Sequence, residues 1–454
     1  MRRRIPLNPC DYMIFAHHRR ALRRRYGGNV PFMMLDLDRH IEPQRVRSAL
    51  VGAMLAHPAV IASLRASPFR LRPYWLLPRD PAEAVQRAAD RAFSHFDLRA
   101  EPDWQSRLDA LLAERYLPRW NTREGPQVRL EHYAIPDGRT RLCLRWPHFF
   151  MDAQGTQWFL AALGGEGPAY ALPEHLLPDD ARIDPLAETS FGRRIALVRT
   201  NRSARPAAPN DARQWPAQLT PLEDYRLIHR PWDNERFHAF QSAAKAVTTQ
   251  GPALYARRLA ACVIVALHRL QKEHGLRSPT FLTTFPLRVL STERHEAWDA
   301  KRPMIGNYLA TPIIRIPAEL AHDSRAVGRE LDRQLDDFRA RQGALAQWTL
   351  LRWAACFHPW AYDLLFRLPL GLGDFSTGFS YYDATAQPLP AIAGANVTNL
   401  WTGGPTPIPP GLNPVFSRFG QRLNLALTYS RPAVSDQFAQ RFVDLIEDQM
   451  FHPA

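Results

Sequence analysis

The chain has 454 residues, of which 46% are hydrophobic and 22% are charged. This balance is typical of a soluble globular protein, and the length exceeds what one core normally supports, which predicts two domains and at most three. The four cysteines lie far apart without metal-ligand spacing, so we expect reduced thiols, no bound metal and a cytoplasmic location. The basic N-terminus has no apolar run like that of a signal peptide, and no run of about 18 uncharged apolar residues predicts a membrane span.

The net charge of +14 raises the question of an acidic partner. Only three of the 58 basic residues are lysines, and the arginines are scattered along the chain, a bias that fits a GC-rich genome. No zinc-finger spacing and no RNA-binding signature is present, so we expect no nucleic-acid partner. A basic surface instead favours a carrier protein, nucleotide phosphates or anionic lipid headgroups.

The first part of the chain alternates predicted helices and strands. Apolar residues recur at helical spacing over 42–65, and this helix should end near His57-Pro58, because a residue before proline disfavours helical backbone. Amphipathic helices are also predicted over 82–95 and 103–116. The stretch "QVRLEHYAIPDGRTRLCLRWPH" predicts two strands joined by a Pro-Asp-Gly turn, and a helix follows from about Thr156.

The rest of the chain predicts a long crossover followed by a second set of mixed elements. Residues 164–235 are rich in Pro, Ala and Asp and show little periodicity, which indicates a connection between two halves. After it come a helix in "GPALYARRLAACVIVALHRLQKEHG" ended by Gly275, a buried strand "TFLTTFPLRVL", a charged helix near 324–342, an aromatic run, the strand "QRLNLALTY" and a last helix from about Ser435. We therefore predict an α+β fold with an N-terminal half over 1–175, a linker over 176–235 and a C-terminal half over 236–454.

One histidine and one aspartate, His148 and Asp152, stand at the seam between a predicted strand and the helix after it. Period-two alternation places His148 on the same strand face as Leu142, Leu144 and Trp146, so this face should be buried. The pKa of histidine lies near neutrality, which lets it take a proton from a hydroxyl or amine and pass it to a leaving thiolate. The alternatives are a hydrogen-bonded histidine at a strand end and a solvated aspartate in a turn.

The stretch "PHFFMDAQG" resembles the HHxxxDG motif of the condensation-domain and chloramphenicol-acetyltransferase superfamily. His148 matches its second histidine and Asp152 its aspartate, whereas Pro147 and Ala153 replace its first histidine and its glycine. "IPLNPCDYMIF" is similar to the opening "LSPxDxxFL" of that superfamily, and "GNYLATPIIRIP" to its "GNxxxxxxxxLP". Weaker similarities in "ALVGAMLAHPAVIASLR", "FLTTFPLRVL" and "QRLNLALTYSRPAVSD" follow in the same order. The most similar branch is that of bacterial wax ester synthase/diacylglycerol acyltransferases.

This resemblance implies two chloramphenicol-acetyltransferase-like halves that form a pseudodimer with a central tunnel, where donor and acceptor meet at His148. It implies that His148 is the catalytic general base and that Asp152 is structural, paired with Arg288 of the second half. Thr398 and Asn399 in "NVTNLW" are candidates to stabilise the oxyanion, with the alternative that they only satisfy strand ends.

Two other features allow more than one interpretation. His17 and His18 are expected on the surface, because no third ligand lies at useful spacing for a metal. The aromatic run over 348–379 is expected to form a core helix, with the alternative that it lines an acyl pocket or touches a membrane.

The function that the resemblance implies is acyl transfer from a thioester donor to a hydroxyl or amine acceptor, in lipid or secondary-metabolite biosynthesis. It favours acyl-CoA as the donor. A phosphopantetheine-linked acyl group on a carrier protein is the alternative, which would make the chain a free-standing condensation enzyme of peptide or polyketide biosynthesis. A non-catalytic condensation-like recruiting module is a third possibility. No bound cofactor is expected, and the partners are a small-molecule or lipid acceptor, with a carrier protein and peripheral membrane contact left open.

Overall fold

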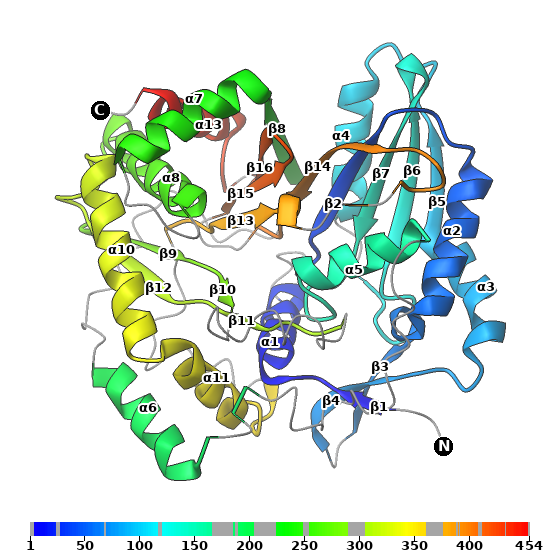
Figure 1. Cartoon of the computed structure of the whole chain (residues 1–454), viewed down its shortest axis with the longest axis horizontal. Helices are drawn as coiled ribbons and strands as arrows, with labels where there is room; N and C mark the ends of the chain where they lie inside the picture. The colour runs from blue at the N-terminus through cyan, green and yellow to red at the C-terminus, as the bar shows by residue number, and fades with distance from the viewer. Residues whose placement is uncertain are drawn as a thin grey trace.

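The structure, a computed structural model, has two halves, each built on a sheet with helices packed around it (Figure 1). It describes residues 4–23, 28–67, 70–116, 120–165, 185–186, 189–203, 224–247, 254–288, 305–359, 376–386, 389, 391–406, 411–431 and 433–452.

The first half contains a five-stranded sheet in the order β14-β2-β7-β6-β5. Its strands are β2 (Phe32–Leu37), β5 (Phe93–Asp97), β6 (Arg129–Ile135), β7 (Arg139–Arg145) and β14 (Val397–Gly403). The antiparallel pair β6 and β7 is joined by a turn with Asp137 at φ 74°, which confirms the predicted Pro-Asp-Gly turn. β14 comes from the C-terminal part of the chain and pairs antiparallel with β2, so it ties the two halves together.

Helices cover both faces of this sheet. They are α2 (Pro43–Ala56), α3 (Pro81–Ala92), α4 (Trp104–Tyr116) and α5 (Ala153–Leu163), with α1 (Pro9–Arg23) nearby and a small sheet of β1 (Arg4–Pro6), β4 (Arg70–Leu76) and β3 (Ser63–Ser67) beside them. Leu142 and Leu144 lie in the apolar cluster of α2 and α5, whereas Cys143 lies in the cluster of α4. The predicted alternation along β7 is therefore confirmed, and α2 ends just before His57-Pro58 as expected.

The second half contains a four-stranded sheet in the order β13-β15-β16-β8. Its strands are β8 (Asp224–Trp232), β13 (Ser380–Asp383), β15 (Leu412–Phe419) and β16 (Arg422–Arg431). Its helices are α6 (Phe191–Ser203), α7 (Asn234–Val247), α8 (Leu254–Glu273), α10 (Ser324–Ala340), α11 (Gly343–Ala354) and α13 (Asp436–Phe451). Two further strand pairs are β9 (Thr280–Thr284) with β12 (Ile313–Pro317), and β10 (Leu287–Arg288) with β11 (Leu309–Ala310).

Several elements differ from what the sequence predicted. α5 begins at Ala153, three residues before Thr156, because the Asp152 side chain caps its first turn. The range over 164–235, expected to be an irregular crossover, contains α6 and β8. Among the described residues, β8 pairs with β16 alone and forms an edge of the sheet. An edge strand tolerates polar residues and proline, so the Arg, His and Pro residues of β8 left no hydrophobic pattern from which to predict it.

The aromatic run is only partly described. Trp348 and Leu351 of α11 are buried, whereas Phe357 beyond it is exposed, and residues 360–375 lie outside the described part of the chain. Among the residues with described positions, every helix is too short or too polar to cross a lipid bilayer.

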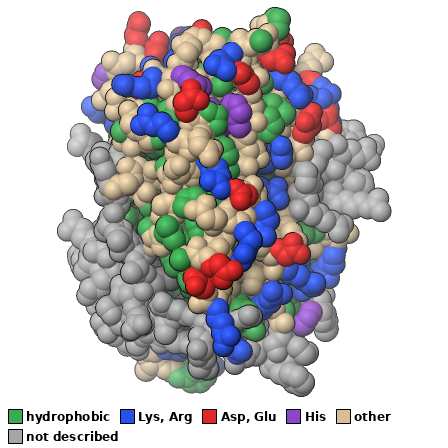
Figure 2. All heavy atoms as spheres, turned by 90° about the vertical axis from the view of Figure 1, so that its right-hand side faces the viewer, with side chains coloured by type: hydrophobic (Ala, Val, Ile, Leu, Met, Phe, Trp, Pro, Cys, Tyr) green, Lys and Arg blue, Asp and Glu red, His purple; other side chains and the backbone are tan. Residues whose placement is uncertain are grey.

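The charged surface is mixed rather than uniform on the face that Figure 2 presents. Basic side chains there are interleaved with acidic ones across the described part of that face. Ion pairs such as Arg47 with Asp90 and Arg87 with Glu83 join α2 and α3 or stabilise α3 locally. Exposed pairs of this kind typically contribute at most about 1 kcal/mol each.

One ion pair is buried within the first half. The Arg145 guanidinium lies 2.6 Å from Glu131 Oε1, and both side chains are 2% exposed. Tyr133 donates a second hydrogen bond to the other oxygen of Glu131, at 2.7 Å. Since β7 leads directly to His148, this pair anchors the strand end that carries the candidate site.

We expect Glu131→Gln to lower the free energy of unfolding by about 3–5 kcal/mol, because it leaves the Arg145 charge buried without a counter-ion. Denaturant titration followed by circular dichroism measures the loss. Glu83→Gln is the matched control, since it removes one partner of an exposed pair and should cost no more than about 1 kcal/mol. Equal losses in the two variants would contradict this account.

Candidate active site

His148 lies three residues beyond β7, in the short loop that leads into α5. Its backbone amide donates to the carbonyl of Asn29 at 2.9 Å, and Trp146 Nε1 closes the loop by donating to the Met151 carbonyl at 2.9 Å. Phe149, the next residue, is fully buried and stacks on Trp75 with ring centroids 5.8 Å apart. The buried face predicted for the strand end is present, but the His148 side chain itself remains partly exposed.

The second half of the chain lies along this loop and forms hydrogen bonds to it. Asn307 Nδ2 donates to the His148 carbonyl at 2.8 Å, and the Gly306 amide donates to the Phe150 carbonyl at 2.8 Å. The Tyr308 amide donates to Asp152 Oδ2 at 3.4 Å. The segment 306–308 therefore holds alternate residues of the His148 loop in place from across the seam between the halves.

Asp152 performs two structural tasks with its two carboxylate oxygens. Oδ1 accepts from the amides of Gln154 and Gly155, both at 3.1 Å, which is the geometry of an N-cap on α5. Oδ2 accepts from Tyr308 of the second half. The side chain is 2% exposed, so the interpretation of Asp152 as a solvated turn residue is wrong.

The position of Arg288 is described for its backbone only. β10 pairs Arg288 with Leu309, the residue that follows Tyr308. Its backbone therefore lies near the segment that contacts Asp152, while its side chain lies outside the described part of the structure. The ion pair between Asp152 and Arg288 stays a prediction.

Sequence reasoning did not identify Asn307 and Asp11 as site residues, although both lie in motifs that it singled out. Asp11 Oδ1 accepts from the Asn307 amide at 2.7 Å and from Asn307 Nδ2 at 2.8 Å. Asn8 and Asp11 also bond to each other's backbone amides at the start of α1, a capping box that "NPCD" could have signalled. Burial raises the pKa of Asp11 to about 8, although its hydrogen bonds with Asn307 oppose that shift.

His18 is not on the surface, contrary to the expectation from the sequence. It is 3% exposed, its ring lies 5.0 Å from that of Phe149, and its Nδ1 accepts from the Asn29 amide at 2.9 Å. Burial lowers the pKa of His18 to about 4, so the ring is a neutral acceptor at pH 7. The carbonyl of the same Asn29 accepts from the His148 amide, so His18 fixes the position of a residue that holds the His148 backbone.

The structure does not bring Thr398 and Asn399 to His148. Strand register pairs Asn399 with Asp36, and Asp36 in turn with Arg141, four residues before the end of β7. At about 3.3 Å per residue, this places Asn399 roughly 13 Å short of the strand end, and His148 lies beyond that end.

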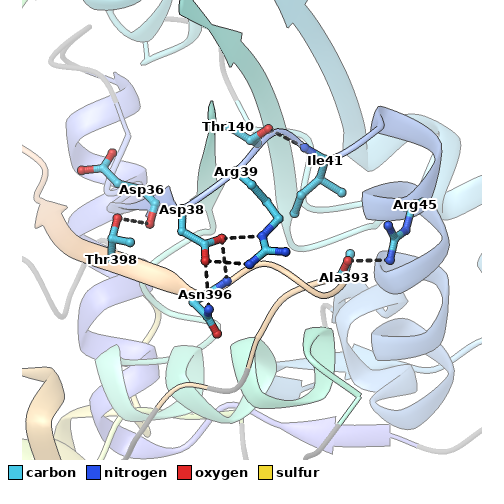
Figure 3. A network of polar contacts seen from close by, with 9 residues as sticks. All are labelled: Asp36, Asp38, Arg39, Ile41, Arg45, Thr140, Ala393, Asn396 and Thr398. Atoms are coloured by element: carbon cyan, nitrogen blue, oxygen red, sulfur yellow. Dashed lines mark hydrogen bonds and ion pairs between the residues drawn. The ribbon is translucent and has the colours of Figure 1, made fainter. Parts of the chain in front are cut away.

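Both candidate oxyanion residues have other partners. Thr398 Oγ1 donates to the Asp36 carbonyl at 3.1 Å, at the edge where β14 meets β2 (Figure 3). Asn399 exchanges hydrogen bonds with the Asn424 side chain at 3.0 and 3.2 Å. The geometry favours the alternative in which these two residues satisfy polar groups along the strands.

A pocket of about 680 Å³ opens at the far end of α5, between that end, α2 and residues 393–394. Arg45 on its wall donates to the Ala393 carbonyl (Figure 3). The pocket is lined by the last two residues of the eleven-residue helix α5, so roughly 14 Å of helix separate it from the loop that carries His148. We therefore do not assign the pocket to the chemistry of His148.

The environment of His148 favours a neutral imidazole. Burial lowers its pKa below 6.5, while its own carbonyl, the Asp152 charge, the Asn307 side chain and the Met151 backbone oppose that shift. A neutral ring that stays partly exposed can accept a proton, and the oxygens around it favour the imidazolium once it forms. Among the described residues, no three His, Cys, Asp or Glu side chains are grouped to hold a metal ion.

If Asp152 and Arg288 form an ion pair, Asp152→Asn and Arg288→Ala should each lower stability and activity together. The double variant should cost less than the sum of the two, with a coupling of about 0.5–3 kcal/mol, because the second change removes a charge that the first left unpaired. Unfolding titrations of the four proteins measure this coupling. Asp323→Asn, which changes the aspartate cap of α10, should instead combine additively with Arg288→Ala. Additivity for Asp152 as well would remove the ion pair from the account.

By sequence, the chain matches no family model and no curated protein. By structure, it is similar over 100% of its length to the first condensation domain of the calcium-dependent antibiotic synthetase, with 97% of that chain covered, 14% identity and a TM-score of 0.70. Trichothecene 15-O-acetyltransferase from Fusarium sporotrichioides is similar over 99% of this chain and 94% of its own, with 11% sequence identity and a TM-score of 0.71. The condensation domain of the Monacolin K polyketide synthase is similar over 100% of this chain and 98% of its own, with 13% sequence identity and a TM-score of 0.64. The chain therefore has the two-half α+β fold of condensation domains and chloramphenicol-acetyltransferase-like acyltransferases, as its resemblance to that superfamily predicted.

Proposed function

We propose that this protein is an acyltransferase that moves an acyl group from a thioester donor to a hydroxyl or amine acceptor, with His148 as the general base. The observation that carries the proposal is the placement of His148. It is a histidine with a lowered pKa, partly exposed, held at the seam between two halves by hydrogen bonds from segment 306–308. The fold supports it, since condensation and acetyl transfer are carried out on this fold.

The proposed reaction has one proton carrier. His148 takes the proton from the acceptor oxygen or nitrogen as that atom bonds to the thioester carbonyl carbon, and a tetrahedral intermediate forms. The intermediate collapses, the carbon–sulfur bond breaks, and the imidazolium returns the proton to the leaving thiolate. No covalent acyl-enzyme is needed. Asp152 does not act on substrate in this scheme, because both of its carboxylate oxygens accept hydrogen bonds from backbone amides of the protein.

Two donors are compatible with this chemistry, and we favour acyl-CoA. The resemblance of "IPLNPCDYMIF" and "GNYLATPIIRIP" to lipid acyltransferases supports acyl-CoA. The starter condensation domain of the rhizomide synthetase, a structural neighbour with a TM-score of 0.61, was solved with C8-CoA and Leu-SNAC. The alternative is an acyl carrier protein, favoured by the full-length similarity to condensation domains. In either case the acceptor is a small molecule or lipid, and a tunnel between the halves would admit it.

His148→Ala should lower turnover by roughly 10²–10⁴-fold, because it removes the proton acceptor, while the unfolding midpoint changes little. In the wild type, kcat/KM should rise with pH through a midpoint below 6.5, because burial depresses the pKa of His148 and only the neutral ring is a base. Release of free thiol from octanoyl-CoA, measured with a chromogenic disulfide at a series of pH values, reports both quantities.

The control is His238→Ala, which removes an exposed histidine of α7 and should leave both the rate and the pH profile unchanged. Near-normal turnover of His148→Ala would show that another group takes the proton. An acid limb above pH 6.5 would show that the environment of His148 is not the one described.

The donor can be identified from the salt dependence of transfer. With acyl-CoA we expect turnover that falls only shallowly with ionic strength, since CoA presents few charges over a small footprint. An acidic carrier protein meeting an arginine-rich face would gain association rate by electrostatic steering, and that gain would fall steeply with salt. Transfer rates with matched octanoyl-CoA and octanoyl-carrier protein across a salt series separate the two. Turnover with the carrier alone, lost at moderate salt, would overturn acyl-CoA. Carrier binding without turnover of either donor would indicate a recruiting module.

A further inference from the structure

We propose that Asn307, held in place by Asp11, is a positioning residue that sets the tautomer of His148. In this arrangement Asn307 Oδ1 accepts a hydrogen bond from Nδ1–H of His148, which leaves Nε2 as the unprotonated nitrogen. The assignment of the tautomer is argued from two neighbouring buried atoms, Asn307 Oδ1 and His148 Nδ1, and does not depend on the reaction. Only the conclusion that Nε2 takes the acceptor's proton rests on the proposed function.

The first step in the argument is the orientation of the Asn307 side chain. The backbone carbonyl of His148 can only accept, so the Asn307 atom that lies 2.8 Å from it is the amide nitrogen, and one hydrogen of that nitrogen is donated to Asp11 Oδ1, also at 2.8 Å. The second hydrogen on Nδ2 is donated to the His148 carbonyl at 2.8 Å. Both donor positions of the amide are therefore used, and Oδ1 is left as an acceptor that requires a donor.

The second step is the absence of a partner on two buried atoms of these neighbouring residues. Asn307 Oδ1 and His148 Nδ1 are both buried, and neither has a hydrogen-bond partner among the residues that the structure describes. A buried polar atom without a partner is costly, and one of these atoms can only accept while the other can donate. Pairing them satisfies both, provided that the proton of the neutral ring is on Nδ1.

The third step is the electrostatic effect of Asn307 on the ring. The Asn307 side chain raises the pKa of His148, which is the effect of an acceptor close to a ring nitrogen. The carbonyls of His148 and Met151 also raise this pKa, so Asn307 is one of several acceptors around the ring. Removing Asn307 should therefore weaken the tautomer preference without abolishing it.

The decisive measurement needs no variant and no activity. Nitrogen-15 NMR of the full chain, labelled at histidine and assigned with His148→Ala, distinguishes the two ring nitrogens by their chemical shifts. We expect a protonated Nδ1 and an unprotonated Nε2 for His148 at pH 7. A wild-type spectrum with the proton on Nε2 would overturn the proposal, whatever the enzyme's reaction proves to be.

Two variants test the role of Asn307 in that preference. Asn307→Ala should give a mixture of tautomers and lower kcat by about 10–100-fold with little change in KM, as loss of an orienting partner does for metal-binding histidines. A double variant, Asp11→Asn with Asn307→Asp, exchanges the two side chains. It keeps one amide and one carboxyl group in contact but places the acidic group at position 307, next to His148. It should move the acid limb of the rate profile upward by about one pH unit or more, because a nearby negative charge favours the imidazolium.

The matched control is Asn424→Ala. Asn424 is equally buried and hydrogen-bonded, to Asn399 and His229, and it touches no part of the candidate site. This variant should lose stability without changing the His148 tautomer or the pH profile. A control that shifts the tautomer as much as Asn307→Ala does, or an exchange variant that folds and keeps the wild-type acid limb, would show that Asn307 has a structural role alone.

Discussion

The arrangement of the candidate site depends on one short contact, the seam where segment 306–308 lies along the loop from His148 to Asp152. Three hydrogen bonds cross it, at 2.8, 2.8 and 3.4 Å. Each is worth about 1 kcal/mol net, so the seam adds little to overall stability. It fixes geometry instead: docking of the second half adds hydrogen bonds to the carbonyls of His148 and Phe150 and to the Asp152 side chain. The pairing of β14 with β2 keeps the two halves docked, because it joins the C-terminal part of the chain to the first half's sheet.

The seam also explains how two buried carboxyl groups can lie beside His148, the proposed base. Asp11 and Asp152 are satisfied by amide donors from residues 307 and 308, in addition to the helix starts that they cap. Amide donors stabilise a carboxylate without adding a full positive charge next to the imidazole. Burial, which acts on His148 as well, keeps the ring neutral at pH 7 while the oxygens around it favour the charged form during reaction. In the proposed reaction, Asp152 and Asn307 therefore act through His148 rather than on substrate.

Much of the fold could be predicted because its elements have strong local signals. The alternation of Leu142 and Leu144 with Cys143 predicts the two faces of β7. The proline after His57 predicts the end of α2. Both signals lie within a few residues of the feature that they predict. β8 could not be found this way, since an edge strand is stabilised by one partner and tolerates polar residues and proline. The candidate site was only half predictable for a similar reason. His148 and Asp152 are four residues apart, whereas Asn307 reaches His148 across 159 residues of chain. Asn399 was predicted to lie near His148, but it pairs with Asp36 near the opposite end of β2, and only the strand register shows this.

The central claim is that a thioester reacts at His148 between the two halves. A crystal structure of the protein with a thioether analogue of octanoyl-CoA, in which a methylene separates the sulfur from the carbonyl, tests this most directly. The account predicts that the analogue's carbonyl carbon lies within roughly 5 Å of the His148 imidazole, leaving room for the acceptor atom at hydrogen-bond distance from the ring. An analogue bound with its carbonyl remote from His148, for instance in the pocket beside Arg45, would contradict it.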